Sequence, residues 1–379
     1  MRKLIARFEM TTPSFLGGLE STVLGLRGPS FRGVLRFWWR ALMFSRHQQD
    51  LRTMRQHEDK LFGSSTAGTG QVQFLPVRAL TDPHSLSWDA VTSHHDGHGL
   101  TYLAYGVTQR PAFAAPLVFD LPLVVRSSTE DSVREALILM GMLGGIGARS
   151  RRGWGSLTLQ QLEEDGQVTW QAPQDGTALE AVWRGLAGNE ATADRARTAL
   201  PPFTVLSSWS RIYLLETGHD ALTILNHVGE EFQRYRSFGR HGKVAGRPAE
   251  QNFREDHDLM LGATQQTVPT HAPERTIFGL PHNYWFSSTK GKASVTSSTQ
   301  RRASPLFLHV QKLADLYAVV AGILPAVFIP DQFLKITATK SYNVPADLTS
   351  YYPRIEQFVT GTHPQDNTPR FPQEVSLWP

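Results

Sequence analysis

Residues Gly144–Ser156, with the sequence GGIGARSRRGWGS, separate a predicted helix from a predicted strand and so decide how the first half of the chain folds. Glycine can adopt positive φ and lets the backbone approach a neighbouring group closely. Between the glycines stand guanidinium groups, which are forked donors for phosphate oxygens, and one indole, which offers a flat face to a base. We predict that this stretch binds a phosphate-bearing ligand through Arg149, Arg151, Arg152 and Trp154. The alternative is a long flexible turn whose arginines are only solvated.

Two nucleotide-binding motifs share features with this stretch but differ from it in residues and in context. A P-loop needs Lys and then Ser or Thr after its last glycine, whereas Ser-Leu follows Gly155. A dinucleotide-binding fingerprint that begins at Gly145 needs a glycine where Ser150 stands. Both motifs connect a strand to a helix, whereas here a predicted helix, Thr129–Leu143, precedes the loop and a predicted strand, Ser156–Leu162, follows it. We therefore expect neither of these sites, and no cofactor.

Outward from the loop, hydrophobic periodicity predicts the order β-α-β-β-α-β for the first half, which is the ferredoxin-like arrangement. One face of such a sheet can act as a platform for single-stranded RNA. The predicted elements are a strand at Lys3–Met10, helices at Ser30–Gln48 and Asp50–Leu61, a strand at Gln71–Leu80 that Pro76 places at an edge or a bulge, a strand at Pro116–Arg126, a helix at Thr129–Leu143 and a strand at Ser156–Leu162.

The predicted helix Ser30–Gln48 carries an apolar stripe with a basic stripe beside it. Arginines this dense favour geometric contact with the phosphates of a polyanion. At about 100° per residue, Trp38 falls within the apolar stripe and Trp39 at its border. We assign Trp38 to the core and expect Trp39 either to shield the rim of the core or to stack on a base. The basic residues predicted to bind RNA here are Arg27, Arg32, Arg36 and Arg40.

The second half repeats a phrase of the first, since Glu58–Gly63 returns as Glu274–Gly279 with the same Phe-Gly ending. Each copy follows a strand and one or two helices by a comparable distance, as expected for two diverged copies of one fold. We predict an α+β protein with two tandem ferredoxin-like (RRM-like, βαββαβ) domains and insertions, at residues 1–170 and 201–379. The second-half elements expected are a strand at Phe203–Leu215, a helix at Ala221–Phe238 and strands at Ser304–Val310 and Tyr317–Ile329.

Three further segments of the second half draw attention through their composition. Ser287–Arg302 is rich in Ser, Thr, Lys and Arg and is expected to be a mobile basic loop. Pro345–Pro379 is rich in proline, shows little periodicity and is expected to wrap the surface. A further basic run consists of Arg234, Arg236, Arg240, Lys243 and Arg247. The residues of the Ser287–Arg302 segment predicted to bind RNA are Lys290, Lys292, Arg301 and Arg302.

Composition restricts the class of protein. A chain of 379 residues can build two domains with proper cores. The chain has no cysteine, which excludes disulfides and thiolate metal sites and favours a cytoplasmic location. No apolar run approaches the length of a membrane span, so no membrane partner is expected. The segment Thr81–Gly99 carries His94, His95 and His98 without further ligands at a defined spacing, and we predict a mobile polar loop and no metal site there.

Five phrases occur in order across most of the chain: RGVLRFWWRAL at 32–42, LFGS at 61–64, Gly144–Ser156, FGLP at 278–281 and RRASPL at 301–306. In these phrases the sequence resembles the RAMP superfamily of CRISPR proteins and, within it, the family of Cmr subunit one from type III-B effectors. The resemblance implies ferredoxin-like domains with a glycine-rich loop between the second helix and the fourth strand. It also implies a scaffold that binds the 3′ region of the guide RNA and the 5′ region of the target RNA and contacts neighbouring Cmr and RAMP subunits in antiviral defence.

The resemblance leaves a ribonuclease as the alternative, because some RAMP relatives cut RNA. Relatives that cut target RNA use an aspartate between the first strand and the first helix, where this chain has only the acid Glu20. Relatives that process guide precursors use a histidine near the first helix, where His47 and His57 stand. A metal-independent cut needs a general base near the 2′-hydroxyl and stabilisation of the phosphorane. We expect a non-catalytic RNA-binding subunit; besides the ribonuclease, a structural cap that contacts only protein stays open.

Overall fold

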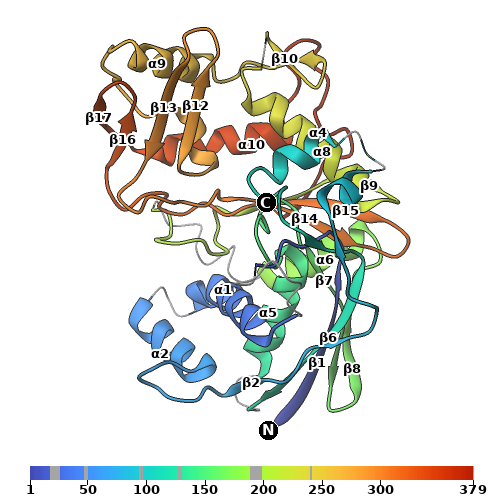
Figure 1. Cartoon of the computed structure of the whole chain (residues 1–379). Helices are drawn as coiled ribbons and strands as arrows, with labels where there is room; N and C mark the ends of the chain where they lie inside the picture. Colours follow the sequence, from blue (N-terminus) through green and yellow to red (C-terminus); the bar gives the residue numbers. More distant parts are fainter. Residues whose placement is uncertain are drawn as a thin grey trace.

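The two halves of the chain each contribute one antiparallel sheet, and a third sheet is added at the far end of the second half. In Figure 1 the first-half sheet lies at the bottom with the N-terminus, the second-half sheet lies above it, and the added sheet is at the top. The computed structural model describes residues 1–17, 26–46, 50–93, 95, 97–126, 130–187, 199–239 and 241–378.

The central strand of the first-half sheet, β1 (Arg2–Met10), alternates buried and half-buried residues from Leu4 onward, as its sequence predicts. It pairs antiparallel with β6 (Leu117–Val125) on one side and with β7 (Leu157–Glu164) on the other. The predicted strand Gln71–Leu80 is broken at Pro76 into two short edge strands on β6, because proline cannot donate to the ladder. The remaining strands are β2 (Val72–Phe74), β3 (Arg78–Ala79) and β8 (Gln167–Gln171), and the order of the sheet is β2-β6-β1-β7-β8.

The two crossover helices of the first half, α1 (Gly28–Arg46) and α5 (Glu130–Leu143), pack against each other and lie within two residues of the predicted boundaries. The second helix in sequence, α2 (Leu51–Phe62), has Asp50 as its N-cap, whose side chain accepts a hydrogen bond from the Arg52 amide at 3.0 Å. α1 and α5 occupy the two crossover positions, between β1 and β2 and between β6 and β7. The connectivity of the first half is therefore the one that the periodicity predicted.

The second-half sheet is built around β9 (Arg211–Gly218), which pairs antiparallel with neighbours on both sides. The order of this sheet is β14-β15-β9-β18, and that of the corresponding strands in the first half is β2-β6-β1-β7. In both sheets the first of these strands in sequence, β9 or β1, lies between the third and the last. The crossover helices are α8, after β9, and α10, before β18. The bounds of the five other elements are β14 (Leu306–Lys312), β15 (Tyr317–Ile323), β18 (Val375–Trp378), α8 (Ala221–Arg236) and α10 (Tyr352–Thr360).

The prediction that Pro345–Pro379 only wraps the surface is wrong, because this segment supplies α10 and β18. Phe358 of α10 and Leu377 of β18 are fully buried. A strand of 4 residues and a helix of 9 residues span too few periods for a hydrophobic pattern to be recognised. Moreover, Pro353 stands in the first turn of α10, where proline starts a helix without breaking it.

The added sheet has the order β12-β13-β16-β17 and collects strands from two connections of the second half. The expectation of a mobile basic loop at Ser287–Arg302 is wrong for the middle of that segment, which forms β13 with Ala293 and Val295 buried. Lys290 lies in the turn before β13 with a φ of 57°. The four strands are β12 (His282–Phe286), β13 (Gly291–Thr296), β16 (Phe333–Thr337) and β17 (Ser341–Pro345).

Shorter elements complete the described part of the chain. They are β4 (Ser85–Leu86), α3 (Trp88–Thr92), α4 (His98–Leu103), β5 (Ala112–Phe113), α6 (Gly176–Ala187), β10 (Lys243–Val244), β11 (Arg247–Pro248), α9 (Arg254–Thr264) and the 3₁₀ turns η2 (Glu274–Phe278) and η3 (Leu348–Tyr351). None of the helices in the described ranges is long and apolar enough to cross a bilayer.

The described residues of Thr81–Gly99 include β4 and α3, and the segment ends at Gly99 against α8, so the prediction of a mobile loop is wrong for them. A Cβ at Gly99 would lie 1.8 Å from the Asn226 carbonyl oxygen, so α4 and α8 cross in backbone contact. A crossing made by glycine leaves no apolar stripe in the sequence, which is why periodicity did not show it. His95 lies 3.8 Å from Asp220, and His98 is exposed. His94 lies outside the described residues.

The two halves meet along β14, whose outer edge is hydrogen-bonded to the first half. The Leu308 amide donates to the carbonyl of Arg151 at 3.1 Å. The Val310 amide donates to Ser156 Oγ at 3.0 Å, and the Lys312 amide donates to Thr158 Oγ1 at 2.9 Å. Backbone groups without hydrogen-bond partners along a strand edge can pair with another chain. Here acceptors of the glycine-arginine loop and β7 bind the amides of this edge.

Both tryptophans of α1 are buried, with exposed fractions of 2% for Trp38 and 3% for Trp39. The expectation that Trp39 lies at the border is wrong, because α2 covers that face and places Phe62 edge-on to Trp39 at 6.1 Å. Trp38 packs on Phe37 at 5.0 Å and on Phe307 of β14 at 5.5 Å. One indole therefore anchors α2, and the other anchors the second half.

We expect Trp38→Ala and Trp39→Ala each to lower the free energy of unfolding by about 3–5 kcal/mol, because each leaves a cavity in a packed core. Urea denaturation of the full chain measures the loss. Trp285→Ala is the control, because Trp285 is 58% exposed on β12, and its expected loss is about 0.5 kcal/mol or less. A Trp39→Ala variant as stable as the control would contradict the packing described here.

Candidate nucleic-acid interface

The glycine-arginine loop, Gly144–Ser156, has a fixed backbone, so the alternative of a flexible turn is not what the structure shows. A Cβ at Gly155, where φ is 63°, would lie 2.1 Å from the Ile146 carbonyl oxygen. A Cβ at Gly153 would lie 2.5 Å from Leu225 of α8. The Ile146 amide donates to the Gly155 carbonyl at 2.9 Å and closes the loop. The glycines let the loop fold on itself and fit between the two halves.

The three arginines of the loop donate to backbone carbonyls. Arg151 Nη1 donates to the Ser304 carbonyl at 2.7 Å, and the guanidinium lies 4.3 Å from the centre of the Phe307 ring. Arg152 Nη2 donates to the Phe278 carbonyl at 3.1 Å. Arg149 is exposed and donates to the Tyr105 carbonyl. Arg151 and Arg152 therefore bridge from the first half to the second.

Other arginines join them from the second half. Besides burial, the positive charge of Arg301 contributes to lowering the pKa of Arg149, and that of Arg302 contributes to lowering the pKa of Arg151. The structure therefore brings these four predicted residues together. Arg302 Nη2 donates to the Val327 carbonyl at 2.8 Å. Arg301 is exposed.

Arg236 on α8 completes this group, and sequence reasoning did not select it. Its guanidinium lies 4.9 Å from the centre of the Phe232 ring, which Arg152 faces at 4.7 Å. Its Nη1 donates to the Tyr102 hydroxyl at 2.9 Å. The basic run 234–247 was the available signal, but Arg234 in the same run pairs with Glu231 at 3.0 Å. We call Arg149, Arg151, Arg152, Arg236 and Arg302 the junction cluster.

No carboxylate in the described part of the chain forms an ion pair with the junction cluster. Burial and then the charge of Arg302 lower the pKa of Arg151 to about 10. Burial and then the charge of Arg236 lower the pKa of Arg152 to about 9. Within the described residues, Arg152 Nη1 and Arg236 Nε are buried without a hydrogen-bond partner. Buried like charges without a counter-charge are unfavourable, so the cluster is suited to an external anion.

The arginines of α1, which are also predicted to bind RNA, lie apart from the junction cluster. Arg36 Nε donates to Glu58 Oε1 of α2 at 2.7 Å, and Arg40 Nε lies 3.7 Å from the same oxygen. Arg32 is exposed, with its guanidinium 5.3 Å from the centre of the Phe74 ring. Arg36 and Arg40 clamp α2 and line a hollow of about 400 Å³ beside it. They do not join the junction cluster, although α1 itself approaches the loop, where Arg151 lies 5.5 Å from the Phe37 ring centre.

The remaining predicted residues are divided between the core and the surface. Trp154 is fully buried between Phe15 at 5.2 Å and Trp88 at 5.6 Å, so its predicted stacking role is wrong, as it is for the buried Trp39. A tryptophan between glycines suits a ligand or a core equally, and only the neighbours decide. Arg27 is exposed before α1, and Lys290 and Lys292 are exposed on the β12–β13 hairpin of the uppermost sheet in Figure 1, away from α1.

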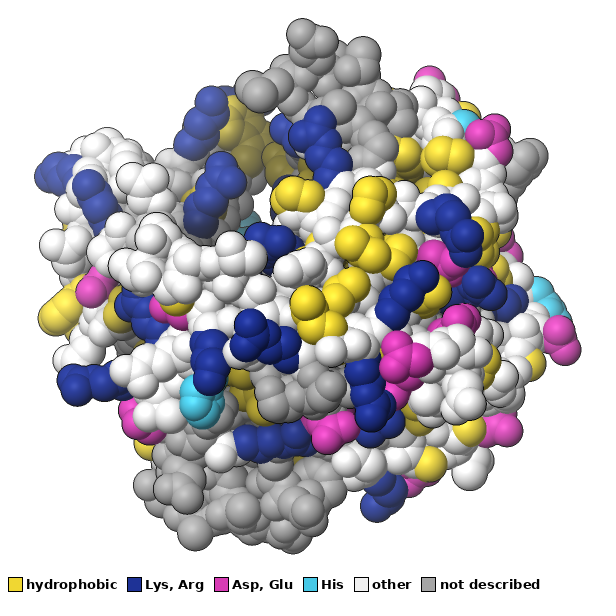
Figure 2. All heavy atoms as spheres, turned by 90° about the horizontal axis from the view of Figure 1, so that it is seen from below, with side chains coloured by type: hydrophobic (Ala, Val, Ile, Leu, Met, Phe, Trp, Pro, Cys, Tyr) yellow, Lys and Arg dark blue, Asp and Glu magenta, His cyan; other side chains and the backbone are white. Residues whose placement is uncertain are grey.

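Basic side chains are spread over the face seen from below. Figure 2 shows dark-blue Lys and Arg side chains around a hollow on this face, with hydrophobic side chains at its border. Acidic side chains lie among the basic ones on other parts of this view. The mixture agrees with the modest net charge of +4, and it means that the arrangement of the charges decides where an anion binds.

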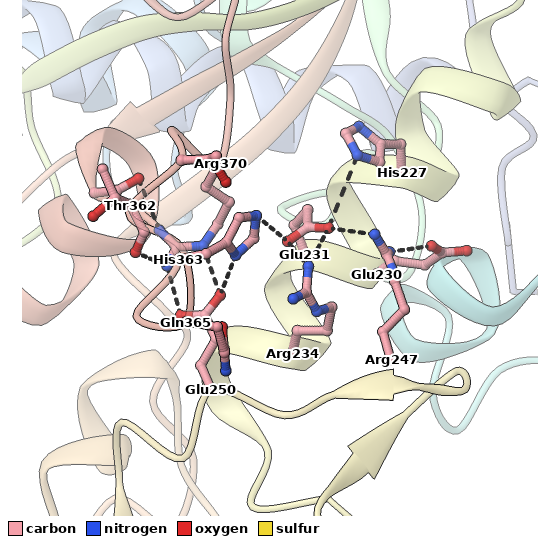
Figure 3. A network of polar contacts seen from close by, with 12 residues as sticks. His227, Glu230, Glu231, Arg234, Arg247, Glu250, Thr362, His363, Gln365 and Arg370 are labelled. Atoms are coloured by element: carbon pink, nitrogen blue, oxygen red, sulfur yellow. Dashed lines mark hydrogen bonds and ion pairs between the residues drawn. The ribbon is translucent and has the colours of Figure 1, made fainter.

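A second group of arginines, beside α8, is fully paired (Figure 3). Arg370 Nη2 lies 2.6 Å from Glu250, which is fully buried, and Arg247 lies 2.7 Å from Glu230. Glu231, Glu250 and His363 offer ligand atoms within 4.8 Å of one another, as a metal site would require. Arginines already balance these carboxylates, so we interpret the group as an ion-pair network that holds the C-terminal segment to α8.

A sequence model of the RAMP superfamily matches residues 7–158, from β1 through the glycine-arginine loop to β7. This part of the chain is therefore similar to the RAMP superfamily. The CRISPR system Cmr subunit Cmr1-2 of Pyrococcus furiosus is 27% identical over 188 residues, which are 43% of this chain and 98% of the relative. Subunit Cmr1-1 of the same organism is 28% identical over 162 residues, which are 41% of this chain and 47% of the relative.

Two solved structures share the fold over nearly the whole chain. The crystal structure of Cmr1 from Pyrococcus furiosus in its apo form has a TM-score of 0.57 and 17% identity, and the match covers 100% of this chain and 99% of that one. A chain in the cryo-EM structure of the type III-B Cmr-beta bound to cognate target RNA has a TM-score of 0.51 and 10% identity, with 94% and 99% covered. The common fold therefore extends beyond the residues that the superfamily model matches.

His309 of β14 fixes the start of the glycine-arginine loop from within the core. The ring is buried, and Nδ1 donates to the Gly144 carbonyl at 2.9 Å. Burial lowers the pKa of His309 to about 4. In the unfolded chain a histidine has a pKa of about 6.5. At a pH between these two pKa values, His309 therefore binds a proton in the unfolded state but not in the folded state.

We therefore expect His309 to make the stability of the chain fall as the pH falls from about 6.5 toward 4. In His309→Asn the amide can still donate to Gly144, but it does not titrate, so the decrease in melting temperature between neutral and acidic pH should be smaller. His98→Asn, at an exposed position, is the control and should keep the wild-type profile. Identical profiles for all three chains would show that His309 is not the titrating group.

Proposed function

We propose that this chain is a non-catalytic RNA-binding subunit of a type III-B CRISPR effector in antiviral defence. It holds the 3′ region of the guide RNA and the 5′ region of the target RNA and contacts neighbouring Cmr and RAMP subunits. The similarity to Cmr1 subunits supports the assignment to the effector, and the shared fold with a chain of a target-bound Cmr complex supports RNA as the ligand.

The observation that carries this proposal is the unbalanced charge of the junction cluster. By contrast, Arg234 of α8 pairs with Glu231, and Arg247 pairs with Glu230 of the same helix. RNA phosphates supply the negative charge that the junction cluster lacks, and guanidinium groups bind them through forked hydrogen bonds. Contacts of this kind depend on charge and backbone geometry, so binding depends little on base sequence.

We further propose that the chain is a tandem of two ferredoxin-like domains with insertions. The support is the equal strand order of the two sheets and the equal position of their crossover helices. Because the junction cluster draws arginines from both halves, the RNA site depends on the repeat: neither half holds the complete set.

The absence of catalysis is part of the proposal. His282 on β12 is the histidine whose pKa the junction cluster influences: burial and then the charges of Arg275 and Arg236 lower its pKa well below the usual value. A general base works best when its pKa is near the operating pH, so His282 is a weak base for RNA cleavage. His57 is exposed on α2, and Glu20 and His47 lie outside the described residues.

To test RNA binding, we replace the two exposed arginines of this surface together, Arg149→Ala and Arg301→Ala. Each lost phosphate contact should reduce the slope of log affinity against log salt by about 0.7, because fewer counterions are released from a single strand. The control removes the same charge at Arg184 and Arg254, which form exposed ion pairs within their own helices. Equal losses of slope in the two double variants would contradict a defined site at the junction.

To test catalysis, the full chain is incubated with end-labelled single-stranded RNA without added metal, and we expect the RNA to be retained and uncut. An assembled effector with Glu20→Ala, His47→Ala and His57→Ala should also cut its target at every wild-type position. A cut that disappears in this triple variant, or in His282→Ala, while RNA binding stays normal would make the chain a ribonuclease.

A further inference from the structure

A small open cavity lies between α1, the glycine-arginine loop and β14, next to the junction cluster. Its volume is about 220 Å³, below the roughly 300–1,000 Å³ of typical small-molecule pockets. Its walls include Phe37 and Trp38 of α1 and Phe307 of β14. Arg151 also lines it, so the cavity and the cluster share a side chain.

Gly33, near the start of α1, lines the same cavity. The packing of the protein does not explain why a glycine stands at this position. Glycine destabilises a helix relative to alanine. A Cβ at Gly33 would meet no atom within 4 Å, whereas a Cβ at Gly141 of α5 would lie 2.3 Å from the Leu159 side chain. The glycine of α5 is required by a neighbour within the chain, and the glycine of α1 is not. Its effect is to leave the cavity open.

We propose that this cavity receives one unstacked nucleobase of the bound RNA, while Arg151 and the rest of the junction cluster hold the adjoining phosphates. The inference rests on the proposed function and identifies the part of the RNA that this cavity takes. Aromatic walls bind bases of any identity, because every base presents a π face. The Arg151 guanidinium lies 4.3 Å from the centre of the Phe307 ring and pairs with no carboxylate of the described residues. It is therefore suited to an RNA strand, whose phosphates are negatively charged.

The same wall argues against an apolar side chain of a protein partner as the occupant. Such a side chain would remove the remaining water from the partly buried Arg151 without providing a counter-charge, which is unfavourable for a cation. A nucleotide provides both the flat apolar group and the anion. We therefore assign the cavity to RNA.

The test compares Gly33→Leu with Gly185→Leu in the full chain. Gly185 of α6 is the matched control, because it is also an exposed helical glycine whose Cβ would meet no atom within 4 Å, and it does not line the cavity. Leucine favours a helix more than glycine does, so both variants should fold, as circular dichroism verifies. The probes are labelled oligoadenylate and an abasic ribose-phosphate strand of the same length.

We expect Gly33→Leu to bind oligoadenylate about 5- to 150-fold more weakly than wild type, the range for one stacked base. Binding of the abasic strand and the salt dependence should not change, because the phosphate contacts stay. Gly185→Leu should match wild type with both probes. Phe37→Leu, which removes one aromatic wall with a small change of volume, should also weaken only the base-containing strand.

The outcomes separate this inference from the proposed function. If wild type binds neither strand, the proposed function fails and the base site fails with it. If wild type binds RNA with a normal salt dependence but Gly33→Leu binds oligoadenylate equally well, only the base site is overturned. An equal loss with both probes would also overturn it, because the leucine would then disturb phosphate contacts and not a base.

Discussion

The hydrogen bonds along the outer edge of β14 are the constraint on which the rest of the structure depends. A strand edge in the middle of the molecule must have its amides satisfied, and here Ser156 and Thr158 hydroxyls and the Arg151 carbonyl accept from them. These acceptors come from the loop and from β7, so the second-half sheet has one position relative to the first. Because the loop is held there, its arginines project into the junction between the halves.

The arginines of this chain serve two different purposes, and their partners distinguish them. Arg36, Arg234 and Arg370 meet buried or partly buried glutamates and hold helices and the C-terminal segment in place. Arg151 and Arg152 meet carbonyls and aromatic rings, which orient a guanidinium without neutralising it. A density of arginine in the sequence therefore does not show which guanidinium groups are neutralised within the chain; their partners in the structure do.

The arginines of the junction cluster converge because of the way in which the two sheets are joined. Each half has the same strand order, and the edge strand β14 of the second half faces the loop of the first. The loop meets β14 on one side and α8 on the other, so arginines from Arg149–Arg152, α8 and the start of β14 converge. The fold shared with Cmr1 of Pyrococcus furiosus covers both halves.

The sequence by itself determined the elements whose signals are local. The period of two in Lys3–Met10 predicted β1, Pro76 predicted an edge or a bulge, and the glycines of Gly144–Ser156 marked a loop between a helix and a strand. Only the tertiary structure decided the environment of each side chain. Trp39 and Trp154 are buried because Phe62 and Phe15, which are distant in sequence, pack on them. Burial and ion pairing depend on such neighbours, and a pattern read along one segment contains no information about the segment that will cover it.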